Sequence, residues 1–156
     1  MNMIAPRSLA QDFDRLGTMG STKQGVVAVV SDNPATIANM GSVCDFLDLR
    51  MEVVSTAADL CQVLLEHQPM AVIADVEGDA QDGFHIMKLI ARHDADMAVM
   101  LLTGGDAVLM GAADAVQEMC GLTSVTLSSE FPLGGQLVAF LFSAGRRMGC
   151  LRLVPV

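Results

Sequence analysis

Short apolar runs alternate with segments of helical periodicity from Gly25 onward, and this alternation constrains the fold more than any other feature of the chain. Val26 to Val30 is a continuous aliphatic run, which is typical of a strand buried on both faces of a sheet. Asp32-Asn33-Pro34 ends this run, and apolar side chains at helical spacing follow it. Because the same order recurs along the chain, the sequence predicts repeated βα units.

Five such units fit into the sequence. The expected strands are Val26–Val30, Met51–Ser55, Met70–Ala74, Met97–Leu102 and Thr123–Leu127. Parallel strands need crossover connections, and these are right-handed in nearly all proteins, so few topologies remain. We expect an α/β fold: a flavodoxin-like, doubly wound sheet of five parallel strands in the order 2-1-3-4-5, with helices on both faces.

The chain divides into three segments. Its 156 residues fit one domain, which we place at residues 25–148. Residues 1–24 are expected to form a flexible N-terminal arm with a possible short helix, because Leu9, Phe13 and Leu16 fall on one helical face. Residues 149–156 are expected to form a C-terminal tail.

Composition excludes several classes of function. Eighteen acidic residues against nine Lys and Arg give a net charge of −9, whereas a nucleic-acid partner calls for clustered cations. The longest apolar stretch, Met97 to Leu102, is far shorter than the ~20 residues that span a bilayer. The N-terminus lacks the apolar core of a signal peptide, and the four cysteines lack metal-ligand spacing. We therefore expect a cytoplasmic protein that binds neither nucleic acid nor membranes directly.

Polar side chains follow the predicted strands at their carboxyl ends, where open α/β sheets place their sites. Ser31 and Asp32 follow the first strand, Asp75 the third and Thr103 the fourth. In the expected strand order these ends are neighbours, so Asp32 and Asp75 should converge near the Thr103 hydroxyl. Asp32 could instead cap a helix, and Thr103 could be a turn residue. Asp75 is harder to assign to a structural role, because burying a carboxylate without a cation or donors is costly.

These residues, in this order, resemble the response-regulator receiver domain of two-component signalling. Ser31-Asp32 stands where the family has an acidic pair, Asp75 where it has its phosphoacceptor, Asp82-Gly83 where it has Asp-Gly, and Thr103 where it has a switch hydroxyl. The resemblance covers about Gly25 to Arg147. It implies a signalling domain that is not an enzyme and whose partner is another signalling protein.

Two departures from the family bear on function. Ser31 replaces the first acidic residue, so Asp32 and Asp75 are left to hold the family's Mg²⁺, weakly if at all. The family also has a lysine after the fifth strand, and the matching position here is Ser129 or Glu130, depending on where the gap is placed. Because transfer of a phosphoryl group depends on cations that neutralise its oxygens, we expect phosphorylation of Asp75 to be weak or absent.

The expected function is that of an atypical, stand-alone pseudo-receiver: a protein–protein interaction module in signalling or regulation, without a required cofactor. Its partner would be a kinase, another regulator or a second copy of the chain. The resemblance implies docking, or a homodimer, through the fourth helix, fifth strand and fifth helix, which include Ala107–Met110, Leu133 and Phe140.

The alternative is a functional single-domain response regulator that accepts a phosphoryl group on Asp75 from a histidine kinase or phosphotransfer protein. A small enzyme or nucleotide binder is disfavoured, since neither GxGxxG nor GxxxxGK[ST] occurs.

Overall fold

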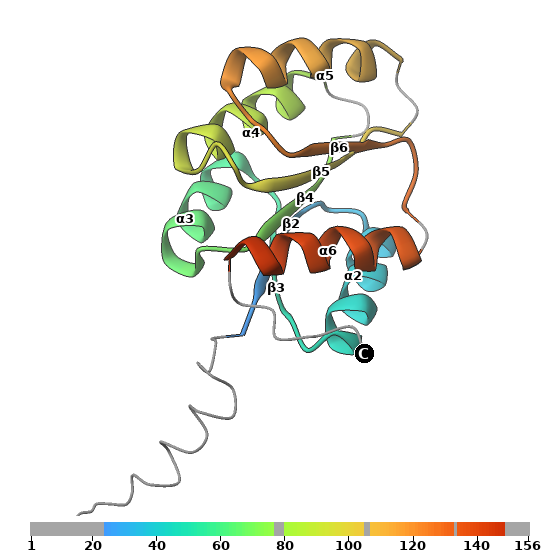
Figure 1. The fold of residues 1–156 in the computed structure, drawn as a ribbon. Helices are drawn as coiled ribbons and strands as arrows, with labels where there is room; N and C mark the ends of the chain where they lie inside the picture. Colours follow the sequence, from blue (N-terminus) through green and yellow to red (C-terminus); the bar gives the residue numbers. More distant parts are fainter. Residues whose placement is uncertain (1–23, 77–79, 105–106, 133, 149–156) are drawn as a thin grey trace, which may run out of the picture.

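The computed structural model describes residues 24–76, 80–104, 107–132 and 134–148. Five parallel strands form one sheet in the order β3-β2-β4-β5-β6, with helices on both faces (Figure 1). The strands are β2 (Val26–Val30), β3 (Arg50–Val54), β4 (Ala71–Asp75), β5 (Ala98–Leu102) and β6 (Val125–Ser128). The helices are α2 (Pro34–Phe46), α3 (Ala57–His67), α4 (Ala80–His93), α5 (Ala107–Cys120) and α6 (Gly134–Met148). The strand order is 2-1-3-4-5 along the chain, so the expected flavodoxin-like fold is confirmed.

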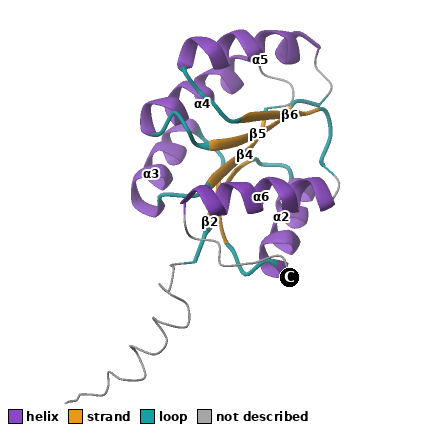
Figure 2. Ribbon diagram, viewed as in Figure 1, coloured by secondary structure: helices purple, strands orange, loops and turns teal. Residues whose placement is uncertain are grey.

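Each face of the sheet has its own apolar core. Helices α3, α4 and α5 cover one face, and α2 and α6 cover the other (Figure 2). Successive residues of a strand point to opposite faces, so Val72 packs in the first core and Ile73 in the second. Among the described methionines, five are buried in these cores: Met40, Met70, Met87, Met97 and Met100. Much of the methionine content therefore fills the interior.

The strand register brings the carboxyl ends to one edge of the sheet. Val30 lies opposite Ala74 in the β2–β4 pair, and Asp75 lies opposite Leu102 in the β4–β5 pair. Leu102 in turn pairs with Ser128 of β6. Residues that follow β2, β4 and β5 therefore emerge side by side.

Capping side chains fix the two loops at this edge. The side chain of Asn33 accepts a hydrogen bond from the Ala35 N–H at 2.9 Å, and Pro34 opens α2. Thr56 Oγ1 accepts from the Asp59 N–H at 3.1 Å and caps α3. Asn33 is thus the cap of α2, and the suggested capping role of Asp32 is not needed.

Charged side chains tie the opposite edge of the fold together. Arg147 near the end of α6 forms an ion pair of 2.9 Å with Asp94, which follows α4. Asp94 also accepts a hydrogen bond from the Asp96 N–H at 2.9 Å. Partial burial raises the pKa of Asp94, but this N–H and the nearby Arg147 outweigh it and hold the pKa below its usual value. The pair links α6 to the turn that leads into β5.

The buried thiol of Cys44 is a packing group. Burial, helped by the negative charge of Asp45, raises the pKa of Cys44 to about 11. The neutral thiol therefore predominates at physiological pH, which suits its place in the core between α2 and the sheet. The described cysteines Cys44, Cys61 and Cys120 are all free.

Some sequence expectations concern segments that the structure does not describe. The proposed arm, apart from Gln24, and the proposed tail of residues 149–156 lie outside the described residues. The resemblance to receiver domains implies that Asp82-Gly83 starts a helix, but helix α4 begins at Ala80, so this pair lies inside the helix. Within the described part of the chain, every helix is too short or too polar to cross a bilayer.

Adjacent leucines on α3 provide a test of which side of the helix is buried. Leu64 is 1% exposed and Leu65 is 71% exposed. Leu64→Ala should lower the free energy of unfolding by about 2–5 kcal/mol, because it removes apolar contacts and leaves a cavity. Leu65→Ala should change it by less than about 0.5 kcal/mol. Urea denaturation followed by circular dichroism measures both values, and equal losses would contradict this packing of α3.

Candidate functional site

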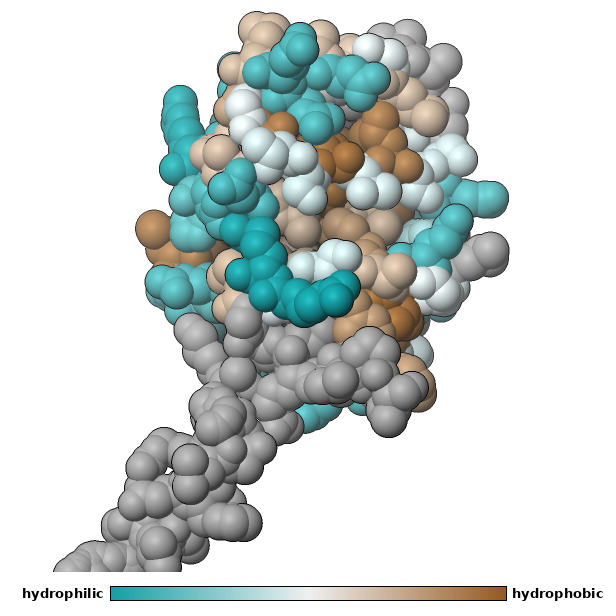
Figure 3. Space-filling view, viewed as in Figure 1, coloured by the Kyte–Doolittle hydropathy of each residue, from teal (hydrophilic) through white to brown (hydrophobic). Residues whose placement is uncertain are grey.

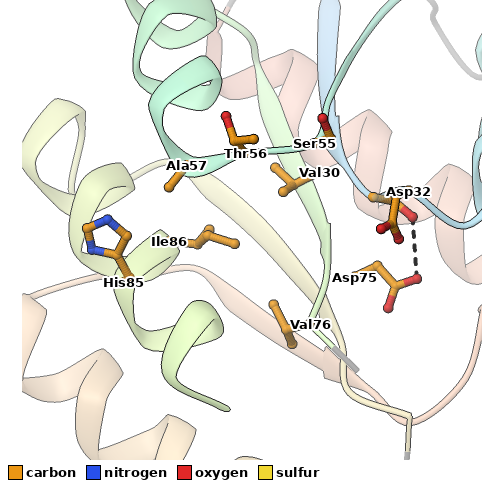
Figure 4. A pocket seen from close by; sticks show the side chains of 10 residues that line it. Val30, Asp32, Ser55, Thr56, Ala57, Asp75, Val76, His85 and Ile86 are labelled. Atoms are coloured by element: carbon orange, nitrogen blue, oxygen red, sulfur yellow. Dashed lines mark hydrogen bonds between the residues drawn. The ribbon is translucent and has the colours of Figure 1, made fainter. Parts of the chain in front are cut away.

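A cavity of about 420 Å³ opens at the carboxyl edge of the sheet, beside β2 and β4. Its described lining residues are Val30, Ser31, Asp32, Ser55, Thr56, Ala57, Asp75, Val76, His85 and Ile86. Figure 4 shows the side chains of Asp32 and Asp75 close together at one end and His85 on α4 at the other, with Ile86 between them. The cavity therefore has an acidic end and an apolar middle.

Ser31 connects the loop after β2 to Asp75. Its backbone N–H donates to the Val54 carbonyl at 3.1 Å, and its hydroxyl oxygen accepts from the Asn33 N–H at 3.0 Å. The hydroxyl proton is then directed to Asp75 Oδ2, at an O···O distance of 3.4 Å (dashed line in Figure 4). Ser31 is buried. It thus presents a fixed, neutral hydroxyl to the carboxylate.

Thr36 is a site residue that the sequence analysis missed. It lies in the first turn of α2, is buried, and places Oγ1 3.4 Å from Asp75 Oδ2. Both hydroxyl contacts to this oxygen are longer than the ~2.7–2.8 Å of a typical O–H···O bond, so each is weak. A signal was present: Thr36 precedes Met40 and Cys44 at intervals of four residues, so the three share the buried face of α2.

Asp75 is the last residue of β4 and is half-buried, whereas Asp32 is exposed in the loop after β2. The structure brings these two predicted carboxylates to the same end of the cavity, together with Ser31. The described residues contain no cluster of three or more His, Cys, Asp or Glu side chains that could hold a metal ion. A Mg²⁺ ion, which prefers six oxygen ligands, would have two carboxylates and a hydroxyl from this set.

Thr103 lies at the same edge, as predicted, and is fully buried. Its N–H donates to the Ser128 carbonyl at 2.8 Å, and its hydroxyl donates to the same oxygen at 3.3 Å. On the other side of β5, the Val76 N–H donates to the Leu102 carbonyl at 3.0 Å. The hydroxyl at the predicted switch position is thus bonded to the backbone of β6.

Ser129 and Glu130 follow β6 and are both exposed. The Ser128 hydroxyl donates to the Glu130 carbonyl at 2.5 Å and closes this turn. Ser129 and Glu130 are not among the described residues that line the cavity, and that lining set contains no lysine or arginine. The described cavity wall therefore contributes no permanently positive side chain.

The chain is similar in sequence to a bacterial transcriptional regulatory protein. The C4-dicarboxylate transport transcriptional regulatory protein DctD of Pseudomonas aeruginosa is 29% identical over 132 residues, which are 84% of this chain and 27% of that protein. The chain thus spans about a quarter of the length of the relative it matches. No family model matches the chain.

Solved structures agree in fold. The receiver domain of a sensor histidine kinase from Pseudomonas aeruginosa PAO1, determined with a magnesium ion coordinated in its active site cleft, has a TM-score of 0.59 and 17% identity, over 81% of this chain and 99% of that one. A response regulator receiver domain protein from Clostridium thermocellum has a TM-score of 0.64 and 20% identity, over 80% and 97%. The chain therefore has the fold of response-regulator receiver domains, and its resemblance to that family is confirmed.

Proposed function

We propose that this chain is an atypical receiver domain that acts as a protein–protein interaction module in signalling or regulation, with phosphorylation of Asp75 weak or absent. It acts in the cytoplasm and is not an enzyme. The observation that carries the proposal is the set of side chains around Asp75: Ser31 and Thr36 place hydroxyls on its carboxylate, and the described cavity wall has no lysine or arginine. The relative and the neighbouring folds support the role in signalling.

The charge balance disfavours phosphorylation. Attack by a carboxylate on a phosphoryl group needs cations that neutralise the transferring oxygens, and Mg²⁺ supplies this charge when it is bound. Ser31 contributes a neutral oxygen where the resemblance implies a carboxylate, so the attraction for Mg²⁺ is weakened. A phosphoryl group would also add about −1.5 to −2 of charge next to Asp32. The two hydroxyls, in contrast, stabilise the unmodified carboxylate.

The contacts at this edge of the sheet also support the proposal that the domain keeps one conformation. A ligand that inverts a two-state equilibrium must prefer one state by about 5.5 kcal/mol. Thr103 is fully buried and bonded twice to the Ser128 carbonyl, and no lysine or arginine in the described cavity wall would pull on a phosphoryl group. We therefore propose that the module presents one docking surface, independent of phosphorylation.

The proposed docking surface consists of α5, β6 and α6. A groove of about 560 Å³ lies against β6 and α6, and its described lining residues are Met100, Ser124, Thr126, Leu127, Ser128, Pro132, Gln136, Ala139, Phe140 and Ser143. None of these groove side chains is charged, and Figure 3 shows pale and brown residues between the teal ones on this face. In a chain of net charge −9, an uncharged groove lets two copies pack there without local repulsion. Leu133 and the side chains of residues 107–109 lie outside the described part.

A functional response regulator is the second candidate. The observation in its favour is that Asp75 ends β4 beside Asp32, where a phosphoacceptor is expected. A histidine kinase or a phosphotransfer protein would then donate the phosphoryl group.

Reaction with acetyl phosphate distinguishes the atypical receiver domain from the functional response regulator. Incubation of the purified protein with acetyl phosphate and Mg²⁺ should leave its intact mass essentially unchanged, because the described cavity wall supplies no lysine or arginine and Mg²⁺ should bind weakly. Mass spectrometry of the wild type and of Asp75→Asn measures this. Stoichiometric gain of one phosphoryl group in the wild type, lost in Asp75→Asn, would establish the second candidate.

Restoring one carboxylate should strengthen Mg²⁺ binding. We expect Ser31→Asp to lower the Kd for Mg²⁺ at least about tenfold, equivalent to about 1.4 kcal/mol, because it adds a third carboxylate at the acidic end. Ser55→Asp is the matched control, since Ser55 lines the same cavity on the loop before α3. Isothermal titration calorimetry measures all three proteins. A similar gain from both substitutions would indicate general charge attraction and would contradict a specific role of position 31.

A substitution on β6 tests whether the chain forms a homodimer through the proposed docking surface. Thr126 is exposed and lines the groove, so Thr126→Lys should place two like charges in a self-interface and convert a dimer to a monomer. Ser42→Lys on α2, which is also exposed and outside the groove, is the control. Sedimentation velocity measures the mass of each protein. A wild type that is monomeric at all concentrations would leave a kinase or another regulator as the partner.

A further inference from the structure

The two edge strands of the sheet, β3 and β6, lie at opposite ends of the strand order (Figure 1). Within the described ranges β3 pairs with β2 alone, so one side of its backbone faces away from the sheet. We propose that this outer side of β3 is a self-association surface, on which β3 of a second copy pairs in the antiparallel direction about a two-fold axis. This surface is separate from the proposed docking surface, which contains β6.

The backbone groups that face this side belong to Met51 and Val53. The Arg50 N–H donates to the carbonyl of Gly25, just before β2, at 2.9 Å, so Arg50 directs its backbone groups toward β2. Successive residues of a strand present their N–H and C=O groups to alternate sides, so those of Met51 and Val53 point outward. Such an edge is a template for pairing with another chain.

The side chains of β3 carry opposite charges two residues apart. Arg50 Nε lies 2.8 Å from Glu52 Oε2, and the two side chains are 53% and 24% exposed. His67 at the end of α3 places Nε2 3.8 Å from Glu52 Oε1. Charges on an edge strand ordinarily oppose pairing between chains. A basic and an acidic residue at this spacing, however, are complementary to the same pair in reverse order, and β3 of a second copy presents that pair.

One antiparallel register satisfies both the backbone and the charges. With Met51 of one copy opposite Met51 of the other, the outward N–H and C=O groups of the two residues bond reciprocally, and each Arg50 lies opposite a Glu52. These flanking positions form non-hydrogen-bonded pairs, in which side chains come closer together. A shift that sets Glu52 opposite Glu52, or Arg50 opposite Arg50, brings like charges together and is destabilised. The charge pattern therefore selects a self-complementary contact centred on Met51.

The opposite face of the same ladder is apolar. Met51 packs on the core between the sheet and α2. Val53 points to the same side as Met51 and is 42% exposed, and among the described residues it is the one strand residue with an exposed large apolar side chain. In the register centred on Met51, Val53 of each copy lies opposite Leu49 of the other. Pairing therefore covers an exposed valine on the α2 side, while the charges pair on the α3 side.

This contact goes beyond the proposed function and does not depend on whether Asp75 is phosphorylated. A strand of five residues supplies a short ladder, so the contact is weak and forms in concentrated solution. Because the two surfaces lie at opposite edges of the sheet, Thr126→Lys, which is expected to be monomeric in dilute solution, should still associate through β3 when concentrated.

Charge reversal on β3 tests the contact in the full-length protein. Sedimentation equilibrium of concentrated Thr126→Lys measures the Kd for self-association with the docking surface blocked. Arg50→Glu and Glu52→Arg, each added to Thr126→Lys, should raise this Kd at least about tenfold, because each sets like charges opposite one another. Arg92→Glu, on exposed α4 surface, is the matched control with an unchanged Kd.

Mixing the two β3 variants provides the rescue. The glutamates at positions 50 and 52 of one chain then lie opposite the arginines of the other, so a mixed dimer should form with the Kd of Thr126→Lys. This recovery also shows that both variants fold.

Three results would overturn the proposal. One is the absence of association in concentrated wild type or Thr126→Lys, and another is association that Arg50→Glu leaves unchanged. The third is slow amide hydrogen exchange at Met51 and Val53 that does not depend on protein concentration, since another segment of the same chain would then cover the edge. Acetyl phosphate labelling of Asp75 is measured separately, so it can refute the proposed function without bearing on β3.

Discussion

The parallel pairing of β4 with β2 and β5 determines where every site residue lies. This register sets Ala74 opposite Val30 and Asp75 opposite Leu102, so the residues that follow three strands meet at one edge. A slip of one residue would turn each side chain of β4 to the other face of the sheet. Such a slip would move Asp75 away from Thr36 on α2 and exchange Val72 and Ile73 between the two cores. Core packing and site assembly thus depend on the same register.

At this edge, the hydroxyls of Ser31 and Thr36 contact the Asp75 carboxylate. The Ser31 hydroxyl accepts from the Asn33 N–H, and this orients its proton toward Asp75. The half-buried carboxylate thereby gains donors, which offset part of the cost of removing it from water. These contacts hold the loop after β2 against the end of β4.

The sequence predicted the architecture well because buried parallel strands are continuous apolar runs. Val26–Val30 was predicted with the bounds that the structure shows, whereas the last strand was expected at Thr123–Leu127 and is found at Val125–Ser128. This edge strand is only partly buried, so its pattern is weaker. Convergence of Asp32, Asp75 and Ser31 followed from topology, but the contact from Thr36 did not. A polar residue in a first helical turn is ordinarily read as solvent-facing, and only its spacing from Met40 reveals the buried side.

Hydrogen bonds link the cavity to the groove at β6. The Val76 N–H binds the Leu102 carbonyl, and the next residue, Thr103, binds the Ser128 carbonyl through both its N–H and its hydroxyl. Val76 lines the cavity and Ser128 lines the groove. A contiguous path is not in itself coupling, because coupling needs an element with two states that both sites bias. A ligand shifts an equilibrium only by its differential affinity for the two states. A ligand in the cavity therefore leaves the groove unchanged unless it favours a state in which the hydrogen bonds from Thr103 to the Ser128 carbonyl are broken.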